Sequence, residues 1–115
     1  MRSRYVIVLV LVFSFIYLAC SKDSLKVKYE VSGKATKAAA IEYTANSNGE
    51  RSLVFNASLP WTYQVLVDRG DTVYLGAIAG DSICVKIYVE NIFGGFDLKA
   101  QDWDDNSAEA RCIAE

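Results

Sequence analysis

The residues that could carry chemistry in this sequence are 3 cysteines and 14 carboxylates, because the chain has no histidine. Without histidine there is no Ser-His or Cys-His dyad and no histidine-bearing metal site. Paired carboxylates can perform acid–base catalysis, as in glycosidases. On so small a domain, however, 14 carboxylates form chance pairs. We therefore expect a protein that is not an enzyme and that uses no cofactor.

One acidic segment, Asp102-Trp103-Asp104-Asp105-Asn106, is rich in oxygen ligands and could in principle bind calcium. It lacks the central glycine and the downstream bidentate glutamate that a calcium loop uses. We expect a solvated loop and no metal site. Gly94-Gly95 is likewise no phosphate-binding loop, because no Lys-Ser or Lys-Thr pair follows it.

The N-terminus reads as a signal peptide. Two arginines precede an apolar run from Tyr5 to Ala19, which ends at Cys20. The run is shorter than the about 20 residues that cross a bilayer as a helix. Leu18-Ala19-Cys20 resembles a bacterial lipobox, although Tyr17 stands where that motif prefers leucine. We predict cleavage after residue 19, lipid on Cys20, and a polar tether over residues 20–24; an ordinary secretory cut with a free Cys20 thiol is the alternative.

The remaining chain suits one small exported domain over residues 25–115. Loss of two arginines reduces the 12 basic side chains to 10, against 14 acidic ones, so the mature chain carries a net charge of −4. With a pI near 5.1 and no basic stripe, nucleic-acid binding is not expected. A domain of this size buries one modest core.

Cys84 and Cys112 remain as an even pair once Cys20 is lipidated, and exported domains commonly form disulfides. Bridging them would stabilise the fold by about 3.6 kcal/mol on the chain-entropy model. Cys84 alternates with Ile83 and Val85, and Cys112 precedes Ile113, which we expect to point inward. If both strands share one sheet, the two cysteines meet on its outer face. A bridge through the core is the less expected geometry.

From Leu25 onward, apolar and polar residues alternate in short runs separated by turn residues, which is typical of β-strands. The Asn46-Ser47-Asn48-Gly49 segment predicts a tight hairpin. We predict an all-β, immunoglobulin-like antiparallel β-sandwich of about seven strands. The expected inward sets are Leu25, Val27, Tyr29 and Val31; Trp61, Tyr63, Val65 and Val67; Val73, Leu75, Ala77 and Ala79; and Ile83, Val85, Ile87 and Val89. Leu53, Phe55 and Ala57 are expected on one side of their strand, and Phe96 to Ala100 as a short strand.

Three aromatic residues are candidates for contact with a partner. Tyr74 and Tyr88 lie opposite the apolar stripes of their strands, where exposed aromatic side chains favour binding. Packing on the outer face of a sheet is the alternative. Trp103 is either an exposed contact residue or a cap on the open end of the sandwich.

Several segments, in this order, resemble the small mycobacterial membrane proteins of the MmpS type and their relatives in other bacteria. The resemblance spans nearly the whole mature domain. It rests on Lys28 to Gly33, Ala39 to Tyr43, the Asn-Gly turn, Leu59-Pro60-Trp61, the Gly70 turn, Leu75-Gly76-Ala77, Cys84 to Val89, and Ala110-Arg111-Cys112.

The resemblance implies a β-sandwich outside the cytoplasmic membrane that serves as an accessory to exporters of the resistance-nodulation-division (RND) type. The family's cysteine pair carries over to Cys84 and Cys112. Leu59, Pro60 and Trp61 carry over as a structural motif. The mycobacterial members keep a transmembrane helix where this chain has a lipoprotein-type signal. Relatives often have an Asp-Gly hairpin where this chain has Glu90-Asn91 and a longer loop.

Our functional hypothesis is a non-enzymatic accessory of an RND/MmpL-type exporter, lipid-anchored in the cell envelope and facing the periplasm or the exterior. The alternative is an envelope lipoprotein that binds a small molecule or a glycan. A flat, exposed strand edge would favour a protein partner, whereas a deep pocket with a closed edge would favour a ligand.

Overall fold

The structure, a computed structural model, describes residues 24–115, and these residues form eight antiparallel strands and no helix. The predicted β-sandwich is confirmed, with eight strands where the sequence predicts about seven. The strands are β1 (Ser24–Gly33), β2 (Lys37–Thr44), β3 (Arg51–Ser58), β4 (Trp61–Asp68), β5 (Thr72–Ala79), β6 (Ile83–Glu90), β7 (Phe96–Asp104) and β8 (Ser107–Ile113).

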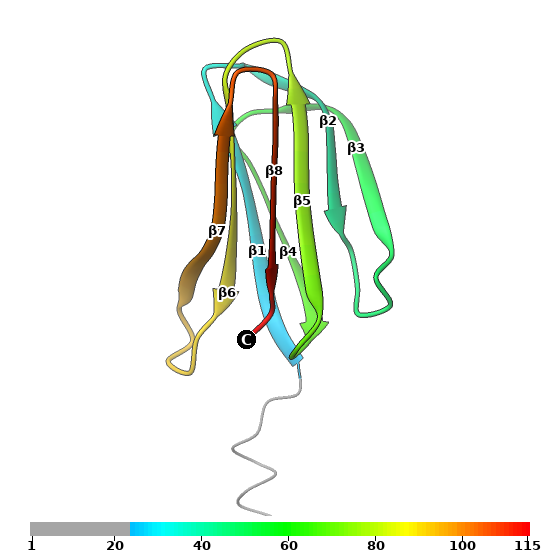
Figure 1. Cartoon of the computed structure of the whole chain (residues 1–115), viewed down its shortest axis with the longest axis vertical. Coiled ribbons are helices and arrows are strands. Elements are labelled where there is room, and N and C mark those ends of the chain that lie inside the picture. Colours follow the sequence, from blue (N-terminus) through cyan, green and yellow to red (C-terminus); the bar gives the residue numbers. More distant parts are fainter. Residues whose placement is uncertain (1–23) are drawn as a thin grey trace, which may run out of the picture.

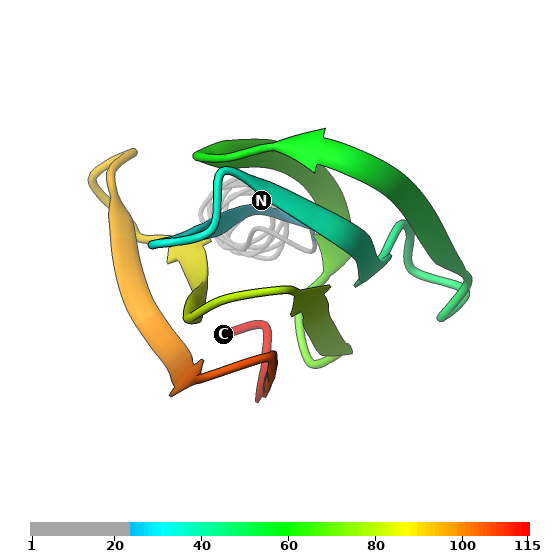
Figure 2. The same cartoon turned by 90° about the horizontal axis from the view of Figure 1, so that it is seen from above.

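Two four-stranded sheets make up the sandwich (Figure 1). Sheet A has the order β4-β1-β6-β7 and sheet B the order β3-β2-β5-β8. Only β2–β3 and β6–β7 are hairpins within one sheet; every other connection crosses from one sheet to the other. On one side of the molecule β7 and β8 pack against each other, as the view from above shows (Figure 2). On the opposite side β3 and β4 are the edge strands and do not pair with each other.

The core forms where the inward faces of the two sheets meet. The alternation in β1 and β6 is fully realised, because each strand buries every second residue between two hydrogen-bonded neighbours. The predicted inward residues of β5 are also confirmed as buried. The side chains with no exposed surface in the two central strands of sheet A are Val27, Tyr29, Val31, Ile83, Val85, Ile87 and Val89.

Tyr29 places a polar atom in this core and satisfies it. Its hydroxyl donates a hydrogen bond of 2.7 Å to the backbone carbonyl of Thr44, which joins sheet A to sheet B at the end of β2. Burial raises the pKa of Tyr29 well above its ordinary value, because the phenolate would lose its hydration inside the core.

We expect this tyrosine to make the fold sensitive to alkaline pH. The unfolded chain loses the Tyr29 proton near the ordinary pKa of 10.0, whereas the folded chain retains it. The stabilising contribution is therefore complete below pH 10 and is lost as the pH rises toward the folded pKa. Urea unfolding between pH 8 and pH 11 should show a falling free energy of unfolding, and Tyr29→Phe should flatten the fall. An unchanged slope in the variant would contradict this assignment.

The turns follow the chemistry that the sequence predicts. In the β2–β3 hairpin, the Oδ1 atom of Asn46 accepts a hydrogen bond of 2.9 Å from the backbone N–H of Asn48. Gly49 then adopts a φ of 78°, which glycine reaches without steric cost. The hairpin predicted at this point is confirmed.

The C-terminal part of the chain differs from the prediction in two respects. β7 runs on to Asp104, so most of the segment expected as a loop from Asp102 to Asn106 is strand. In β8 the inward residues are Ala108, Ala110 and Cys112, whereas Ile113 is half exposed. The register explains this, because Ala110 pairs with the buried Leu75 and alternation then turns Ile113 outward.

β3 also departs from simple alternation. The backbone of Asn56 has a φ of 54°, and its neighbours Phe55 and Ala57 point to opposite faces. The register of β2 with β5 shifts at the facing position, between Ala38 and Ala40. The expectation that Leu53, Phe55 and Ala57 share one side is therefore wrong: Ala57 is buried, and the two larger side chains lie on the outer face.

Candidate interaction surface

The N-terminal predictions lie outside the described residues. These are the signal peptide of residues 1–19, the lipid on Cys20 and most of the tether of residues 20–24. Within residues 24–115 there is no helix long and apolar enough to cross a membrane. In the same part of the chain, no group of three or more acidic or cysteine side chains is placed to hold a metal ion.

The structure does not join Cys84 to Cys112; both are free cysteines. The condition under which the two cysteines would meet, both strands in one sheet, is not fulfilled, because β6 belongs to sheet A and β8 to sheet B. Cys84 lies on the outer face of sheet A and pairs with Trp103. Cys112 packs against the core from sheet B, and burial raises the pKa of its thiol. The two side chains thus leave their sheets in directions that do not meet.

We expect the two thiols to react separately. With N-ethylmaleimide under native conditions, Cys84 should be alkylated before Cys112, whose buried thiol forms less thiolate. Peptide mapping by mass spectrometry would follow each site, and both should react fully in denaturant without reductant. If neither site reacted until reductant was added, a disulfide would be present and the pairing geometry described above would be incorrect.

The Leu59-Pro60-Trp61 motif forms the crossover from sheet B to sheet A. The Leu59–Pro60 peptide bond is cis, and the backbone N–H of Leu59 donates a hydrogen bond of 2.9 Å to the carbonyl of Thr36. Trp61 then begins β4 opposite Val31. Leu59 and Trp61 both pack against the core. These contacts fit the structural role that the sequence predicts for the motif.

Four aromatic rings fill the space between the sheets on the side of β3 and β4. Tyr29 lies 5.6 Å from Tyr43, measured between ring centroids, and Tyr43 lies 5.5 Å from Trp61 and 5.3 Å from Tyr63. Trp61 and Tyr63 are stacked at 6.0 Å. The rings become more exposed from the inside outward, from the buried Tyr29 to the half-exposed Tyr63.

The edges of β3 and β4, with the exposed apolar side chains on these strands, make up what we call the open side of the sandwich. Leu53 and Phe55 on β3 are 56% and 67% exposed, and Tyr63 and Leu66 on β4 are also largely exposed. Because each strand pairs on one flank only, each presents unpaired backbone N–H and C=O groups on the other. The open side thus combines free strand edges with apolar side chains on the outer faces of both sheets, Leu53 and Phe55 on sheet B and Leu66 on sheet A.

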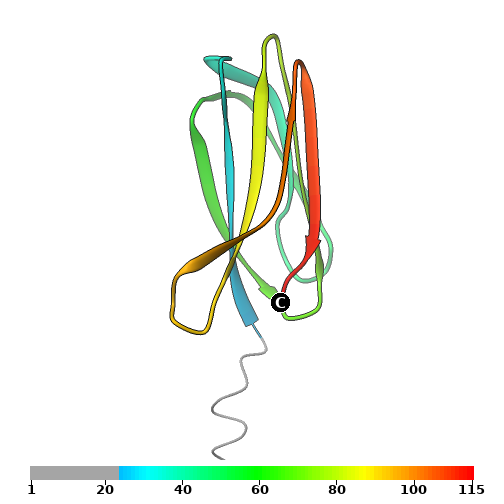
Figure 3. The same cartoon turned by 60° about the vertical axis from the view of Figure 1, so that its left-hand side comes forward.

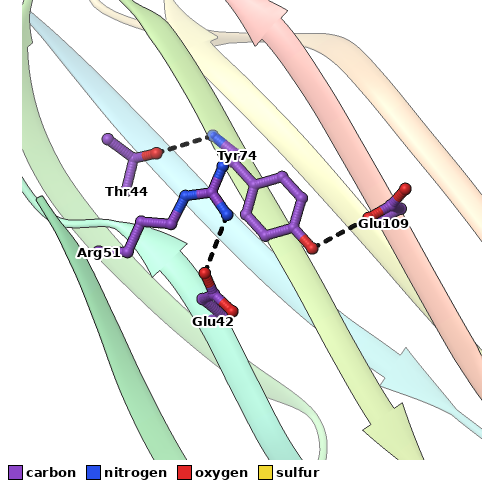
Figure 4. A network of polar contacts seen from close by, with 5 residues as sticks. All are labelled: Glu42, Thr44, Arg51, Tyr74 and Glu109. Carbon is purple, nitrogen blue, oxygen red and sulfur yellow. Dashed lines mark hydrogen bonds and ion pairs between the residues drawn. The ribbon is translucent and has the colours of Figure 1, made fainter. Parts of the chain in front are cut away.

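Tyr74 is the centre of a polar network on the outer face of sheet B (Figure 4). Its hydroxyl donates a hydrogen bond of 3.0 Å to Glu109, and its backbone N–H donates one of 3.0 Å to the Oγ1 atom of Thr44. The Arg51 guanidinium lies 4.1 Å from the ring centroid and donates a hydrogen bond of 2.9 Å to Glu42. Partial burial and the hydrogen bond to Glu109 raise the pKa of Tyr74. These contacts tie together all four strands of sheet B.

The other two aromatic candidates lie on the opposite sheet. Tyr88 is half buried on the outer face of sheet A, where the Nζ atom of Lys28 lies 4.7 Å from its ring centroid. Trp103 is more exposed and pairs with Cys84. The structure therefore does not bring Tyr74, Tyr88 and Trp103 together into one surface.

A hollow of about 460 Å³ lies at the end of the sandwich where β1 begins. It is open to solvent and lined partly by charged side chains, among them Arg69, Glu90 and Asp97, together with Leu25 and Phe93. An open hollow lined partly by charges is not the enclosed, mostly apolar pocket expected for a small-molecule binder.

The sequence model of the family described as Mycobacterium membrane protein matches residues 20–96. The chain belongs to this family. Membership confirms the MmpS-like resemblance and identifies the chain as a membrane-protein relative of MmpS type. No curated protein matches the chain at a significant level.

The matched residues include β1 to β6 and the loop that follows β6, and they end at the first residue of β7. The open side, the Leu59-Pro60-Trp61 crossover and Cys84 therefore lie within the part shared with the family. Cys112 lies outside it, so the match does not carry the cysteine pair over to this chain.

Sequence reasoning missed two groups of exposed apolar side chains. Leu53 and Phe55 were expected on one face with the buried Ala57, and only the backbone irregularity at Asn56 turns them outward. Ile92 and Phe93 were not singled out at all. The available signal was the position of these two bulky apolar residues directly before Gly94, in a turn. Side chains in such a turn have no core to pack against.

Proposed function

We propose that this chain is a non-enzymatic accessory protein of an RND/MmpL-type exporter and that it docks on its partner through the open side. The observation that carries the proposal is the pair of unpaired strand edges, β3 and β4, flanked by exposed Leu53 and Phe55. Membership of a membrane protein family of MmpS type supports it.

The open side has the features that strand-edge recognition uses. An added strand gains backbone hydrogen bonds from an unpaired edge and specificity from alternate side chains. On β3, Leu53 and Phe55 are alternate residues on one face, and Phe55 lies in one row with Ala40 and Ile78 across sheet B. Exposed apolar groups of this kind on a small domain favour a protein partner.

The alternative, an envelope module for a small molecule or a glycan, finds less support. The hollow at the end of the sandwich is open, and charged side chains form part of its lining. The core itself is filled by aromatic and branched side chains. We therefore rank a protein partner above a small ligand.

A site-specific crosslink in native membranes tests the docking. A photoreactive amino acid at position 55 of the full-length, C-terminally tagged chain should capture a transporter subunit that mass spectrometry identifies. The matched control carries the same amino acid at Leu98, which is also half exposed but lies on sheet A. Capture from position 55 and not from position 98 would support the open side as the interface.

The design separates failure of the interface from failure of the function. Capture of a transporter from position 98 alone would keep the accessory role and reject the open side. If neither position captured a transporter from membranes that contain the protein, the exporter partnership would be rejected and ligand screening would follow.

We also propose that lipid on Cys20 anchors the domain in the cell envelope, facing the periplasm or the exterior. The lipobox-like Leu18-Ala19-Cys20 supports this. The intact mass of the protein purified from membranes should correspond to a chain that begins at Cys20 and carries acyl groups. A Cys20→Ser variant should leave the membrane fraction, and an unmodified Cys20 in the native protein would contradict the proposal.

A further inference from the structure

The loop from Asn91 to Gly95, between β6 and β7, presents two adjacent apolar side chains to solvent. Ile92 is 87% exposed and Phe93 is 90% exposed, the highest values among the large apolar residues of the described chain. Neither belongs to the core or packs against it. The fold therefore gives no reason for two such side chains at the tip of a loop.

Hydrogen bonds hold the backbone of this loop in one arrangement. The Oδ1 atom of Asn91 accepts hydrogen bonds from the backbone N–H groups of Phe93 at 2.9 Å and Gly95 at 3.1 Å. Its Nδ2 atom donates to Asp97 at 3.1 Å, and its backbone N–H donates to the Gly95 carbonyl at 2.8 Å. A prearranged apolar tip loses little conformational entropy when it binds a surface.

The tip lies at the end of the sandwich where the described chain begins. Figure 3 shows the β6–β7 loop reaching the level of the start of β1. The backbone N–H of Lys26 donates to the carboxylate of Glu90 at 3.3 Å, and Leu25 and Phe93 line the same hollow. Three residues lie between Cys20 and Ser24, and the four steps along the chain from one to the other span at most about 14 Å. Any anchor in the preceding chain, with its apolar run up to Ala19, therefore keeps this end near the membrane.

We propose that Ile92 and Phe93 form a membrane-contacting tip, which inserts into the interfacial region of the lipid bilayer beside the point where the chain leaves the membrane. The occupant of this surface is lipid and not a protein partner. The proposal rests on membership of a membrane protein family, on the position of the tip and on the N-terminal anchor proposed above. It does not depend on an exporter, because the open side lies along β3 and β4.

The charges around the tip determine which lipid surface fits. The carboxylates at this end include Asp68, Asp71, Glu90, Asp97 and Glu115, whereas the cations near them include Lys26, Lys28 and Arg69. The surplus of negative charge opposes attraction to anionic headgroups. Insertion must therefore be driven by the apolar side chains, and we expect a bilayer without net charge to be preferred.

A Phe93→Trp variant of the full-length chain, reconstituted through its own anchor into phosphatidylcholine vesicles, tests the contact. The native Trp61 and Trp103 lie at the other end of the sandwich, opposite Val31 and Cys84, and serve as internal references. Emission from position 93 should shift to the blue, and lipids brominated on their acyl chains should quench it about twofold or more. Ile78→Trp, an exposed position on the outer face of sheet B, is the matched control and should not be quenched.

Two further measurements make the test specific. Adding anionic phosphatidylglycerol at low salt should reduce the quenching at position 93, because of the surrounding carboxylates. Asn91→Ala in the Phe93→Trp background should also reduce it, because the loop loses its internal hydrogen bonds. Solvent-like, unquenched emission at position 93 would overturn the proposal. So would equal quenching at positions 78 and 93, or quenching that needs anionic lipid.

Discussion

Gly33→Ala is expected to destabilise the domain by about 3 to 5 kcal/mol, a large part of the stability of a small domain. Gly33 ends β1 with a φ of 146°, a conformation that residues with a side chain rarely adopt. A Cβ atom at this position would lie 2.3 Å from the carbonyl oxygen of Ser82 and 2.8 Å from the Cα atom of Ile83. Both atoms belong to the backbone, so no side-chain rotation can relieve the overlap.

The same carbonyl accepts hydrogen bonds from the backbone N–H groups of Lys34 at 3.1 Å and Ala35 at 3.3 Å, so moving it would also disturb the β1–β2 connection. Gly80→Ala is the matched control, because a Cβ atom there has no neighbour within 4 Å. Urea unfolding followed by circular dichroism should show a far lower midpoint for Gly33→Ala and a nearly unchanged one for Gly80→Ala. Equal midpoints would show that the end of β1 does not pack closely against the backbone of Ser82.

Tyr29→Ala is expected to cost about 3 to 5 kcal/mol, because it removes a fully buried ring and leaves a cavity between the sheets. Tyr29 also contacts Tyr43, the first of the rings that fill the open side, and its hydroxyl bridges the two sheets at Thr44. Removing only the hydroxyl, in Tyr29→Phe, should cost about 1 kcal/mol. The difference between the two variants measures the packing of the ring.

Tyr88→Ala provides the comparison on the neighbouring strand. Tyr88 pairs with Lys28, one residue from Tyr29, but it lies on the outer face and is half exposed. We expect it to cost about 1 kcal/mol or less. Thermal unfolding should give the lowest melting temperature for Tyr29→Ala and an intermediate one for Tyr29→Phe. The melting temperature of Tyr88→Ala should be close to that of the wild type. A loss at Tyr88 as large as that at Tyr29 would mean that the outer face of sheet A is covered by a partner in the sample.

The strands with strict alternation could be predicted from the sequence because each of their faces meets a uniform environment. β1, β5 and β6 bury one face between two neighbours, and their apolar residues recur at every second position. The β2–β3 hairpin was also predictable, because Asn46 and Gly49 carry the turn chemistry locally.

The parts that could not be predicted depend on contacts between residues far apart in the chain. The sheet to which β8 belongs is set by its pairing with β5, and this pairing decides that Cys112 faces the core while Ile113 faces solvent. The residue types do not reveal which of the two faces the core, because cysteine and isoleucine are both apolar. The outward position of Phe55 depends on the backbone at Asn56. This one irregular residue reverses the face of the sheet on which the preceding side chains of β3 lie.

The open side was not predictable as a surface for the same reason. Leu53 and Phe55 look like core residues in the sequence, and Tyr63 belongs to an alternating inward set. Tyr63 is exposed because β4 lies at the edge of sheet A, which is a property of the topology, whereas Leu53 and Phe55 lie on the outer face of sheet B because of the backbone at Asn56. The candidate residues Tyr74, Tyr88 and Trp103 were chosen from the alternation of apolar and polar residues along their strands. This alternation alone does not show which sheet a strand joins.

The crossing connections of the sandwich set the order in which its two sheets can be completed. β1 is hydrogen-bonded to β4 and β6, which follow it in the chain by some 30 to 60 residues. A chain that emerges N-terminus first thus cannot complete sheet A, whose last strand along the chain is β7, until residue 104 is available. Folds dominated by such distant contacts form slowly. The topology therefore lets the domain close only after its last strands are available.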